Sequence, residues 1–138
     1  VFAYRGSGVY TTNNDGASWV NVSNGLPVAS EFFVMDFDYI DGVLYVSIDG
    51  SGLYASSDNG TTWTLITGIP GTRIMTIAGH NNDLFVGTYA NGVYYSGDKG
   101  ATWINVNGSN NLSITALTFN GQNIIMNTTN QSVWRKTL

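Results

Sequence analysis

Residues 56–63, SSDNGTTW, decide the fold, because two closely similar octapeptides stand elsewhere in the chain. Residues 12–19 read TNNDGASW, and residues 96–103 read SGDKGATW. The three tryptophans that end these octapeptides are 44 and 40 residues apart. Recurrence at a nearly constant interval indicates a repeat architecture, in which neighbouring units bury each other's apolar faces.

The sequence upstream of each octapeptide repeats at the same interval. The tripeptides GVY at 8–10, GLY at 52–54, GVY at 92–94 and SVW at 132–134 are 44, 40 and 40 residues apart. We therefore expect one domain, residues 1–138, made of repeats at approximately 1–24, 25–68, 69–108 and 109–138.

Each repeat predicts four short strands. In the third repeat they are RIMTIAG (73–79), DLFVGTY (83–89), GVYYSG (92–97) and TWINV (102–106). These segments are rich in β-branched and aromatic residues, are bounded by Gly, Asn and Asp, and show no helical period. A unit of about 40 residues with four strands predicts one blade of a β-propeller, an all-β fold built from small antiparallel sheets.

The chain holds about three and a half repeats of 40–44 residues, with fourteen expected strands. Because propellers typically close with about four to eight blades, three arrangements are open. The chain is a partial propeller, a minimal four-blade arrangement, or half of a ring that a partner chain closes as a homodimer. A missing first strand and a missing last strand leave edges that either invite pairing with another chain or mark a cut from a longer protein.

The octapeptide pattern Ser/Thr-x-Asp-x-Gly-x-Thr-Trp resembles the Asp-box, also called the bacterial neuraminidase repeat, of sialidases, sortilin-type receptors and exported bacterial propellers. Two copies match at every position and the first copy is degenerate, with Asn14 in place of the aspartate. The matching residues are Thr12, Gly16 and Trp19; Ser56, Asp58, Gly60, Thr62 and Trp63; and Ser96, Asp98, Gly100, Thr102 and Trp103.

A scaffold role is expected for these residues. The carboxylate of Asp58 can accept hydrogen bonds from backbone N–H groups two or three residues on, while Gly60 can take the positive φ that the turn requires. We expect the ring of Trp63 to fold over the hairpin between the third and fourth strands. The resemblance implies that the octapeptides lie on the face opposite the ligand site.

Composition excludes some partners. Charged residues make up 10% of the chain and the formal net charge is −4, so a phosphate backbone would meet too few cations. Nucleic acid is therefore not an expected partner. No run of about 18 apolar residues is present, so no membrane partner is expected.

The loops on the opposite face differ from repeat to repeat, and the resemblance implies that ligands bind there. Mixed aromatic, charged and amide side chains on variable loops suit a polar ligand, although ordinary solvated loop residues are the alternative. The candidate ligand-binding residues are Tyr4, Arg5, Glu31, Phe32, Asp49, Arg73, Tyr89 and Asn91.

Catalysis is not expected. A sialidase resemblance implies three arginines around a carboxylate and a tyrosine paired with a glutamate. Arg5, Arg73 and Arg135 fall at three different places in the repeat, and Glu31 is the only glutamate. A fragment of a sialidase-like glycoside hydrolase is kept as an alternative.

No metal site and no cofactor is predicted. Asp36 and Asp38 alternate along a strand that should line the central channel, so they could hold a cation, but solvated or locally hydrogen-bonded carboxylates are favoured. His80 has no second histidine in the chain and is interpreted as a turn residue.

The sequence thus favours a secreted or cell-surface bacterial module. We expect it to be non-catalytic and to bind a glycan or a protein through the loops opposite the octapeptides. A purely structural, self-assembling repeat is a further alternative.

Overall fold

The structure is a computed structural model that describes residues 2–5, 8–27, 33–106, 108–129 and 133–137. These residues form strands and turns, without a helix among them. The strands are β1 (Phe2–Arg5), β2 (Gly8–Thr11), β3 (Val20–Asn21), β4 (Val34–Ile40), β5 (Val43–Ile48), β6 (Gly52–Ser56), β7 (Thr64–Ile66), β8 (Ile74–His80), β9 (Asp83–Thr88), β10 (Val93–Ser96), β11 (Ile104–Asn105), β12 (Ile114–Asn120), β13 (Asn123–Thr128) and β14 (Trp134–Thr137).

The strands form four antiparallel sheets, which we call blades. Blade 1 is β1-β2-β3, blade 2 is β4-β5-β6-β7, blade 3 is β8-β9-β10-β11 and blade 4 is β12-β13-β14. In every blade, strands that follow one another in sequence are paired. The all-β class and the four-stranded antiparallel blades predicted from the sequence are therefore confirmed.

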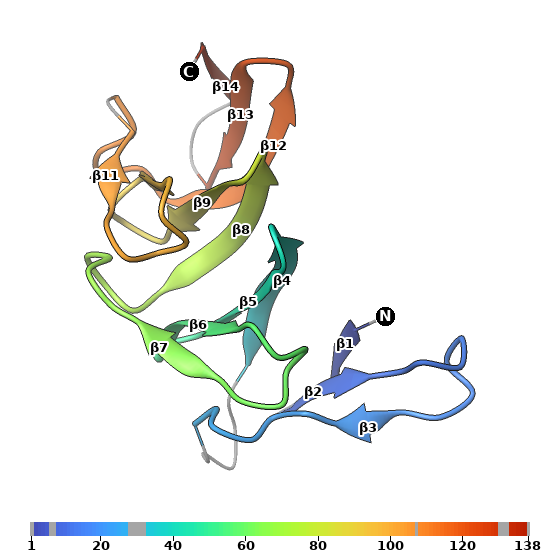
Figure 1. The fold of residues 1–138 in the computed structure, drawn as a ribbon. Coiled ribbons are helices and arrows are strands. Elements are labelled where there is room, and N and C mark those ends of the chain that lie inside the picture. Colours follow the sequence, from blue (N-terminus) through green and yellow to red (C-terminus); the bar gives the residue numbers. More distant parts are fainter. Residues whose placement is uncertain (1, 6–7, 28–32, 107, 130–132, 138) are drawn as a thin grey trace.

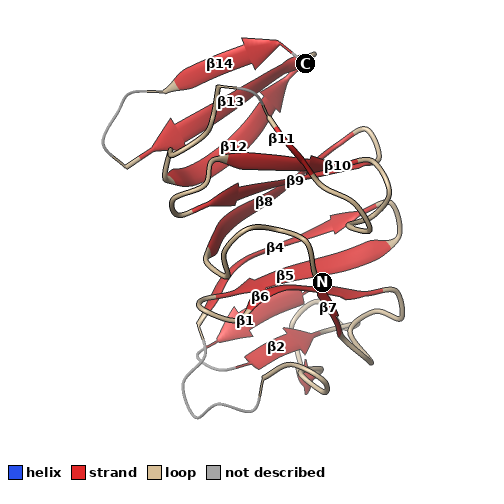
Figure 2. Ribbon diagram, turned by 90° about the vertical axis from the view of Figure 1, so that its left-hand side faces the viewer, coloured by secondary structure: helices blue, strands red, loops and turns tan. Residues whose placement is uncertain are grey.

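The blades follow one another along an open arc (Figure 1). Blades 1 and 4 lie at its two ends, and the side view shows the sheets stacked on one another (Figure 2). Strands β4, β8 and β12, the first strands of blades 2 to 4, form the inner edge, where β8 contacts both β4 and β12. This arrangement is a partial propeller.

A separate hydrophobic cluster fills each space between neighbouring blades. Val9 and Leu44 belong to the cluster between blades 1 and 2, Tyr45 and Leu84 to the one between blades 2 and 3, and Phe85 to the one between blades 3 and 4. Adjacent residues of β5 and β9 thus face opposite neighbours, as the period of a strand requires. Both faces of blades 2 and 3 are buried, which explains why β5 and β9 contain the unbroken apolar stretches at 43–46 and 84–86.

The fourth strand of a blade is shorter than the sequence indicates. The segment at residues 102–106 was expected to be extended throughout, but β11 covers only Ile104–Asn105, and Trp103 precedes it. Thr102 is outside the ladder because its N–H is bonded to the carboxylate of Asp98 at 2.8 Å. Thr102 and Trp103 therefore belong to the turn, although their β-propensity predicts that they are in the strand.

The inner strands carry an irregularity that the sequence analysis did not foresee. The pairing register shifts between Val34 and Asp36, between Ile74 and Thr76, and between Ile114 and Ala116. A β-bulge therefore recurs at the same place in blades 2 to 4, where it increases the local bend and twist. The described residues include no helix that is long and apolar enough to cross a lipid bilayer.

Candidate functional site

The antiparallel strands divide the arc into two faces. The turn face carries the octapeptide turns and the tight turns between the first and second strands of blades 2 to 4. The loop face carries the connections between second and third strands and those between consecutive blades. Of the candidate ligand-binding residues, Asp49, Arg73, Tyr89 and Asn91 lie in described parts of the loop face.

Three of these side chains form one cluster where blades 2 and 3 meet. The Nε of Arg73 donates to Oδ1 of Asp49 at 2.8 Å, and its Nη2 reaches Oδ2 at 3.5 Å. The guanidinium carbon lies 4.7 Å from the ring centroid of Tyr89. The side chain of Arg73 remains 50% exposed, so the carboxylate and the ring orient the guanidinium without burying it.

Backbone hydrogen bonds fix the positions from which these side chains project. The N–H of Tyr89 donates to the carbonyl oxygen of Arg73 at 3.0 Å. The hydroxyl of Ser113, just before β12, donates to the carbonyl oxygen of Tyr89. The cluster therefore joins connections from blades 2, 3 and 4.

Asn91 is placed differently. Its side-chain amide donates to the carbonyl oxygen of Pro70 at 3.2 Å, and its backbone N–H donates to the hydroxyl of Thr88 at 3.0 Å. These bonds brace the connection at residues 89–92 against the connection that leads into blade 3.

The remaining candidates are not brought into the cluster. Tyr4 and Arg5 belong to β1, where Arg5 pairs with Gly8, so Arg5 ends a strand rather than standing in a loop as expected. Their side chains, and all of Glu31 and Phe32, lie outside the described part of the structure. Arg135 is in β14, so the three arginines belong to three different blades.

On the turn face, the octapeptide at residues 56–63 closes through two side chains. Asp58 accepts hydrogen bonds from the N–H of Thr62 at 2.9 Å and from its hydroxyl at 2.6 Å. The buried hydroxyl of Ser56 donates to Asp58 at 2.7 Å and accepts from the N–H of Gly60 at 2.7 Å. The carboxylate thus bonds four residues on, not two or three as expected, because the serine occupies the nearer N–H.

The octapeptide at residues 96–103 repeats this pattern with Ser96, Asp98, Gly100 and Thr102. In both copies, hydrogen bonds from the threonine hydroxyl, the threonine N–H and the serine hydroxyl lower the carboxyl pKa to about 2. These bonds favour the ionised form.

The first octapeptide reaches the same geometry with an amide. Oδ1 of Asn14 accepts from the N–H of Ser18 at 2.9 Å, and the hydroxyl of Thr12 accepts from the N–H of Gly16 at 3.0 Å. The amide nitrogen of Asn14 donates to the Ser18 hydroxyl at 2.8 Å, where the threonine hydroxyl is the donor in the other copies.

The tryptophans join blades, which the sequence analysis missed. The indole N–H of Trp63, in blade 2, donates to the carbonyl oxygen of Val22, in the segment after β3 of blade 1, at 2.7 Å. Trp103 also packs against blade 2, in the cluster that holds Ile66, but its buried indole N–H has no hydrogen-bond partner among the described residues. The sequence contains a sign of this contact. Trp63 stands 41 residues after Val22, and Trp103 stands 37 residues after Ile66, and both apolar residues lie near the end of the preceding repeat.

Asp36 and Asp38 also join blades. Oδ2 of Asp36 accepts from the N–H of Ile77 at 2.8 Å, and Oδ2 of Asp38 accepts from the N–H of Gly79 at 3.0 Å. The carboxylates of β4 therefore bind the free backbone edge of β8. No cluster of three or more metal-ligating side chains occurs among the described residues.

His80 is the last residue of β8 rather than part of the following turn. Its ring stacks on Phe119 of blade 4, with the ring centroids 4.5 Å apart. The histidine is therefore part of the contact between blades 3 and 4.

Comparisons with known proteins agree on the fold. No protein-family model and no curated protein matches the chain. Among solved structures, a GH74 xyloglucanase from Xanthomonas campestris has a TM-score of 0.74 at 15% identity, over 96% of this chain and 25% of its own. YCF48 bound to D1 peptide has a TM-score of 0.67 at 15% identity, over 88% of this chain and 42% of its own.

A third similar structure is the extracellular domain of a B. thetaiotaomicron protein, with a TM-score of 0.63 at 19% identity, over 92% of this chain and 18% of its own. The chain spans a quarter or less of the length of the GH74 enzymes that it matches. By its fold, the chain is therefore a β-propeller module, an open arc of small antiparallel sheets.

Proposed function

We propose that the chain is a non-catalytic module that binds a glycan or a protein segment through its loop face. The observation that carries the proposal is the guanidinium of Arg73, held between the carboxylate of Asp49 and the ring of Tyr89. Nη1 makes no hydrogen bond to any described residue, so it can donate to a ligand. A planar guanidinium suits a carboxylate or a pair of sugar hydroxyls.

Tyr89 supplies the second kind of contact. The side chain is 46% exposed, and its ring offers an apolar surface with a polar tip. A sugar ring or a peptide side chain could stack there while Arg73 bonds a polar group beside it. Tyr4 and Arg5 of blade 1, together with Glu31 and Phe32, which stand between blades 1 and 2 in the sequence, are proposed to extend this surface toward the start of the arc.

The comparisons support both ligand classes. One similar protein is named as a xyloglucanase, and another was solved with a bound peptide. The octapeptides are proposed to be Asp-boxes with a scaffold role, and the module to be secreted or displayed on a bacterial surface. The open arc further supports a homodimer in which a second copy completes the ring.

The test is a titration of the isotopically labelled chain, followed by amide NMR shifts. The probes are a xyloglucan oligosaccharide and, separately, a short peptide with a free terminal carboxylate. We expect one of them to shift the amides around Arg73 and Tyr89. Arg73→Ala and Tyr89→Ala should each weaken that binding at least about tenfold, as loss of a central anchor does.

Lys99→Ala is the matched control. Lys99 forms an ion pair with Asp41 at 2.8 Å, with a side-chain exposure of 52%, but it lies on the turn face. Its replacement should leave binding unchanged. Shifts that cluster on the turn face, or Arg73→Ala and Tyr89→Ala variants that bind both probes as the unchanged chain does, would disprove the proposal.

A fragment of a glycoside hydrolase is a second candidate, because GH74 enzymes are among the similar structures. The same xyloglucan oligosaccharide decides between the two. We expect it to remain intact during prolonged incubation with the chain. Release of new reducing ends, lost in the Arg73→Ala variant, would replace the non-catalytic proposal with an enzymatic one.

A further inference from the structure

Two sites at which a tryptophan packs against the preceding blade repeat along the arc, and we call them tryptophan seats. In the first, Trp63 of blade 2 lies against blade 1, is 7% exposed and bonds Val22. In the second, Trp103 of blade 3 packs against blade 2, in a cluster with Ile40, Tyr45 and Ile66. The glycine of each octapeptide also lies close to the preceding blade. A Cβ added to Gly60 would lie 3.1 Å from Val22, and a Cβ added to Gly100 would lie 3.0 Å from Ile66.

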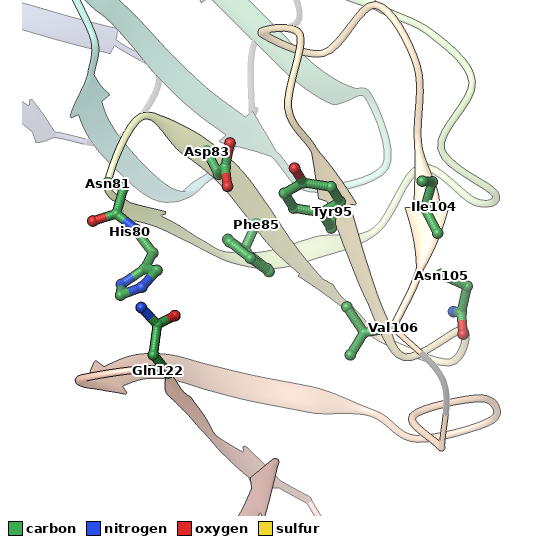
Figure 3. Close-up of a pocket in the computed structure, with 9 residues that line it drawn as sticks. All are labelled: His80, Asn81, Asp83, Phe85, Tyr95, Ile104, Asn105, Val106 and Gln122. Atoms are coloured by element: carbon green, nitrogen blue, oxygen red, sulfur yellow. The ribbon is translucent and has the colours of Figure 1, made fainter. Parts of the chain in front are cut away.

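A third seat of the same construction is present on blade 3. The positions forty residues after Ile40, Tyr45 and Ile66, which are their equivalents in the next repeat, hold His80, Phe85 and Val106. These three residues line a cavity of about 290 Å³, together with Tyr95, Asn105 and Gln122 (Figure 3). No octapeptide turn within the described residues reaches this cavity.

The size and polarity of the third seat suit an indole. Its volume is near the lower end of ligand pockets, about 300–1,000 Å³. Phe85 and Val106 supply buried apolar walls. Oδ1 of Asn105 is buried without a partner among the described residues, and the Asn105 amide is oriented because its Nδ2 donates to Asn91 at 3.2 Å. An N–H donor of a docked segment would satisfy this acceptor.

Among the described residues, the sheet of blade 4 has no counterpart of β7 or β11, the strand that accompanies a filled seat. In blades 2 and 3 the octapeptide leads directly into β7 or β11, which pairs with β6 or β10. In blade 4 the corresponding strand, β14, is the edge of its sheet. An extended segment could add there by main-chain hydrogen bonds, with its side chains entering pockets.

We propose that the third seat docks an extended peptide segment, which places a tryptophan against Phe85 and Val106 and adds a strand to β14. The partner is thus an extended peptide whose chemistry resembles residues 96–106 of this chain. Charge favours a basic residue in its turn, because Asp83 lines the cavity. This inference does not depend on the ligand of the loop face.

The probe is the synthetic peptide SGDKGATWINV, the sequence of residues 96–106. Calorimetry and amide NMR should detect binding, with shifts at Phe85, Val106 and Gln122. The same peptide with alanine in place of tryptophan should bind at least about tenfold more weakly, since the indole is the buried anchor. Because the unchanged chain is used, this comparison does not depend on any variant folding.

Two matched variants locate the site. Ile104→Asp introduces a charge at the cavity, at a side chain that is 65% exposed and should tolerate it. Val20→Asp makes the same change at the equivalent position of blade 1, where the side chain is 62% exposed and the seat is filled by Trp63. Ile104→Asp should weaken peptide binding at least about fivefold, and Val20→Asp should leave it unchanged.

Several results would overturn the proposal. They are no detectable binding of the peptide, equal binding of its alanine version, equal effects of the two aspartate variants, or shifts confined to the loop face around Arg73.

Discussion

At the scale of single residues, a serine hydroxyl organises each complete octapeptide turn. Ser56 and Ser96 are buried, and each both donates to the turn aspartate and accepts from a glycine N–H. One buried group therefore holds two partners in place. The sequence alone predicts this role for the aspartate, because a carboxylate is a common acceptor in turns.

Ser96→Ala should destabilise the fold by about 1–3 kcal/mol, because it leaves the N–H of Gly100 buried without an acceptor. Urea unfolding followed by circular dichroism measures the change. Thr61→Ala is the control, since the hydroxyl of Thr61 lies in an exposed hydrogen bond at 2.9 Å. Equal losses in the two variants would contradict the role given to the buried serine.

The aspartates of the turns predict a pH dependence. Their pKa is lowered to about 2 in the folded chain, from an ordinary value of 3.8. Their contribution to stability is therefore fully present above about pH 4 and is lost as the pH falls through about 2. The midpoint of thermal unfolding should decline over this range.

A variant with Asp58→Asn and Asp98→Asn should lose much of that decline. Asn14 shows that an amide can close the turn, so this variant should still fold. Scanning calorimetry at about pH 6 and about pH 2.5 makes the comparison. A variant whose midpoint falls as steeply as that of the unchanged chain would show that other groups carry the acid sensitivity.

At the scale of elements, the connection between β9 and β10 depends on a close backbone approach. Gly92 has φ +79°, and a Cβ there would lie 2.0 Å from the carbonyl oxygen of Ser109. Gly108 has a similar φ of +87° but open space around the same position. Replacing Gly108 by alanine therefore measures the cost of the positive φ alone. Replacing Gly92 by alanine measures that cost together with the cost of the clash with Ser109.

Gly108→Ala should cost about 1–2 kcal/mol, from the positive φ alone. Gly92→Ala should cost about 2–5 kcal/mol, because the displacement of Ser109 adds to the same conformational cost. Chemical denaturation of both variants tests the difference. Equal costs would mean that the connection adjusts freely and does not brace blades 3 and 4.

Most elements could be predicted from the sequence, because propensity and tertiary contacts agree in them. The segments at β5 and β9 are apolar on both faces, and both faces are buried. The short β11 and the bulge after Val34 could not be predicted, because side-chain bonds and inter-blade packing decide them. The repeat predicts that Asp49, Arg73 and Tyr89 share the loop face, but their mutual contact could not be predicted, because it depends on the conformations of the side chains.

At the scale of the whole molecule, the arc leaves two unmatched ends. Trp19 of blade 1 is 43% exposed, whereas the equivalent Trp63 is 7% exposed, because no described blade precedes blade 1. We expect the chain to bury such ends in a homodimer. Light scattering coupled to size exclusion, over a hundredfold range of concentration, should give a mass near twice 14.9 kDa. A mass of 14.9 kDa at every concentration would contradict the predicted homodimer.

The central structural claim is that the octapeptides join each blade to the one before it. If Trp63 only closed its own hairpin, its loss would affect blade 2 alone. The bond from its indole N–H to Val22 instead predicts an effect on blade 1, about forty residues away in sequence. This difference separates a local turn from a connection between blades.

Amide hydrogen exchange of a Trp63→Phe variant, followed by mass spectrometry, tests the claim most directly. Phenylalanine retains an aromatic ring but cannot bond the carbonyl oxygen of Val22, which costs about 1–3 kcal/mol. We expect exchange in β2 and β3 of blade 1 to accelerate by about tenfold or more, together with exchange in β6 and β7. Acceleration confined to β6 and β7 would contradict the account.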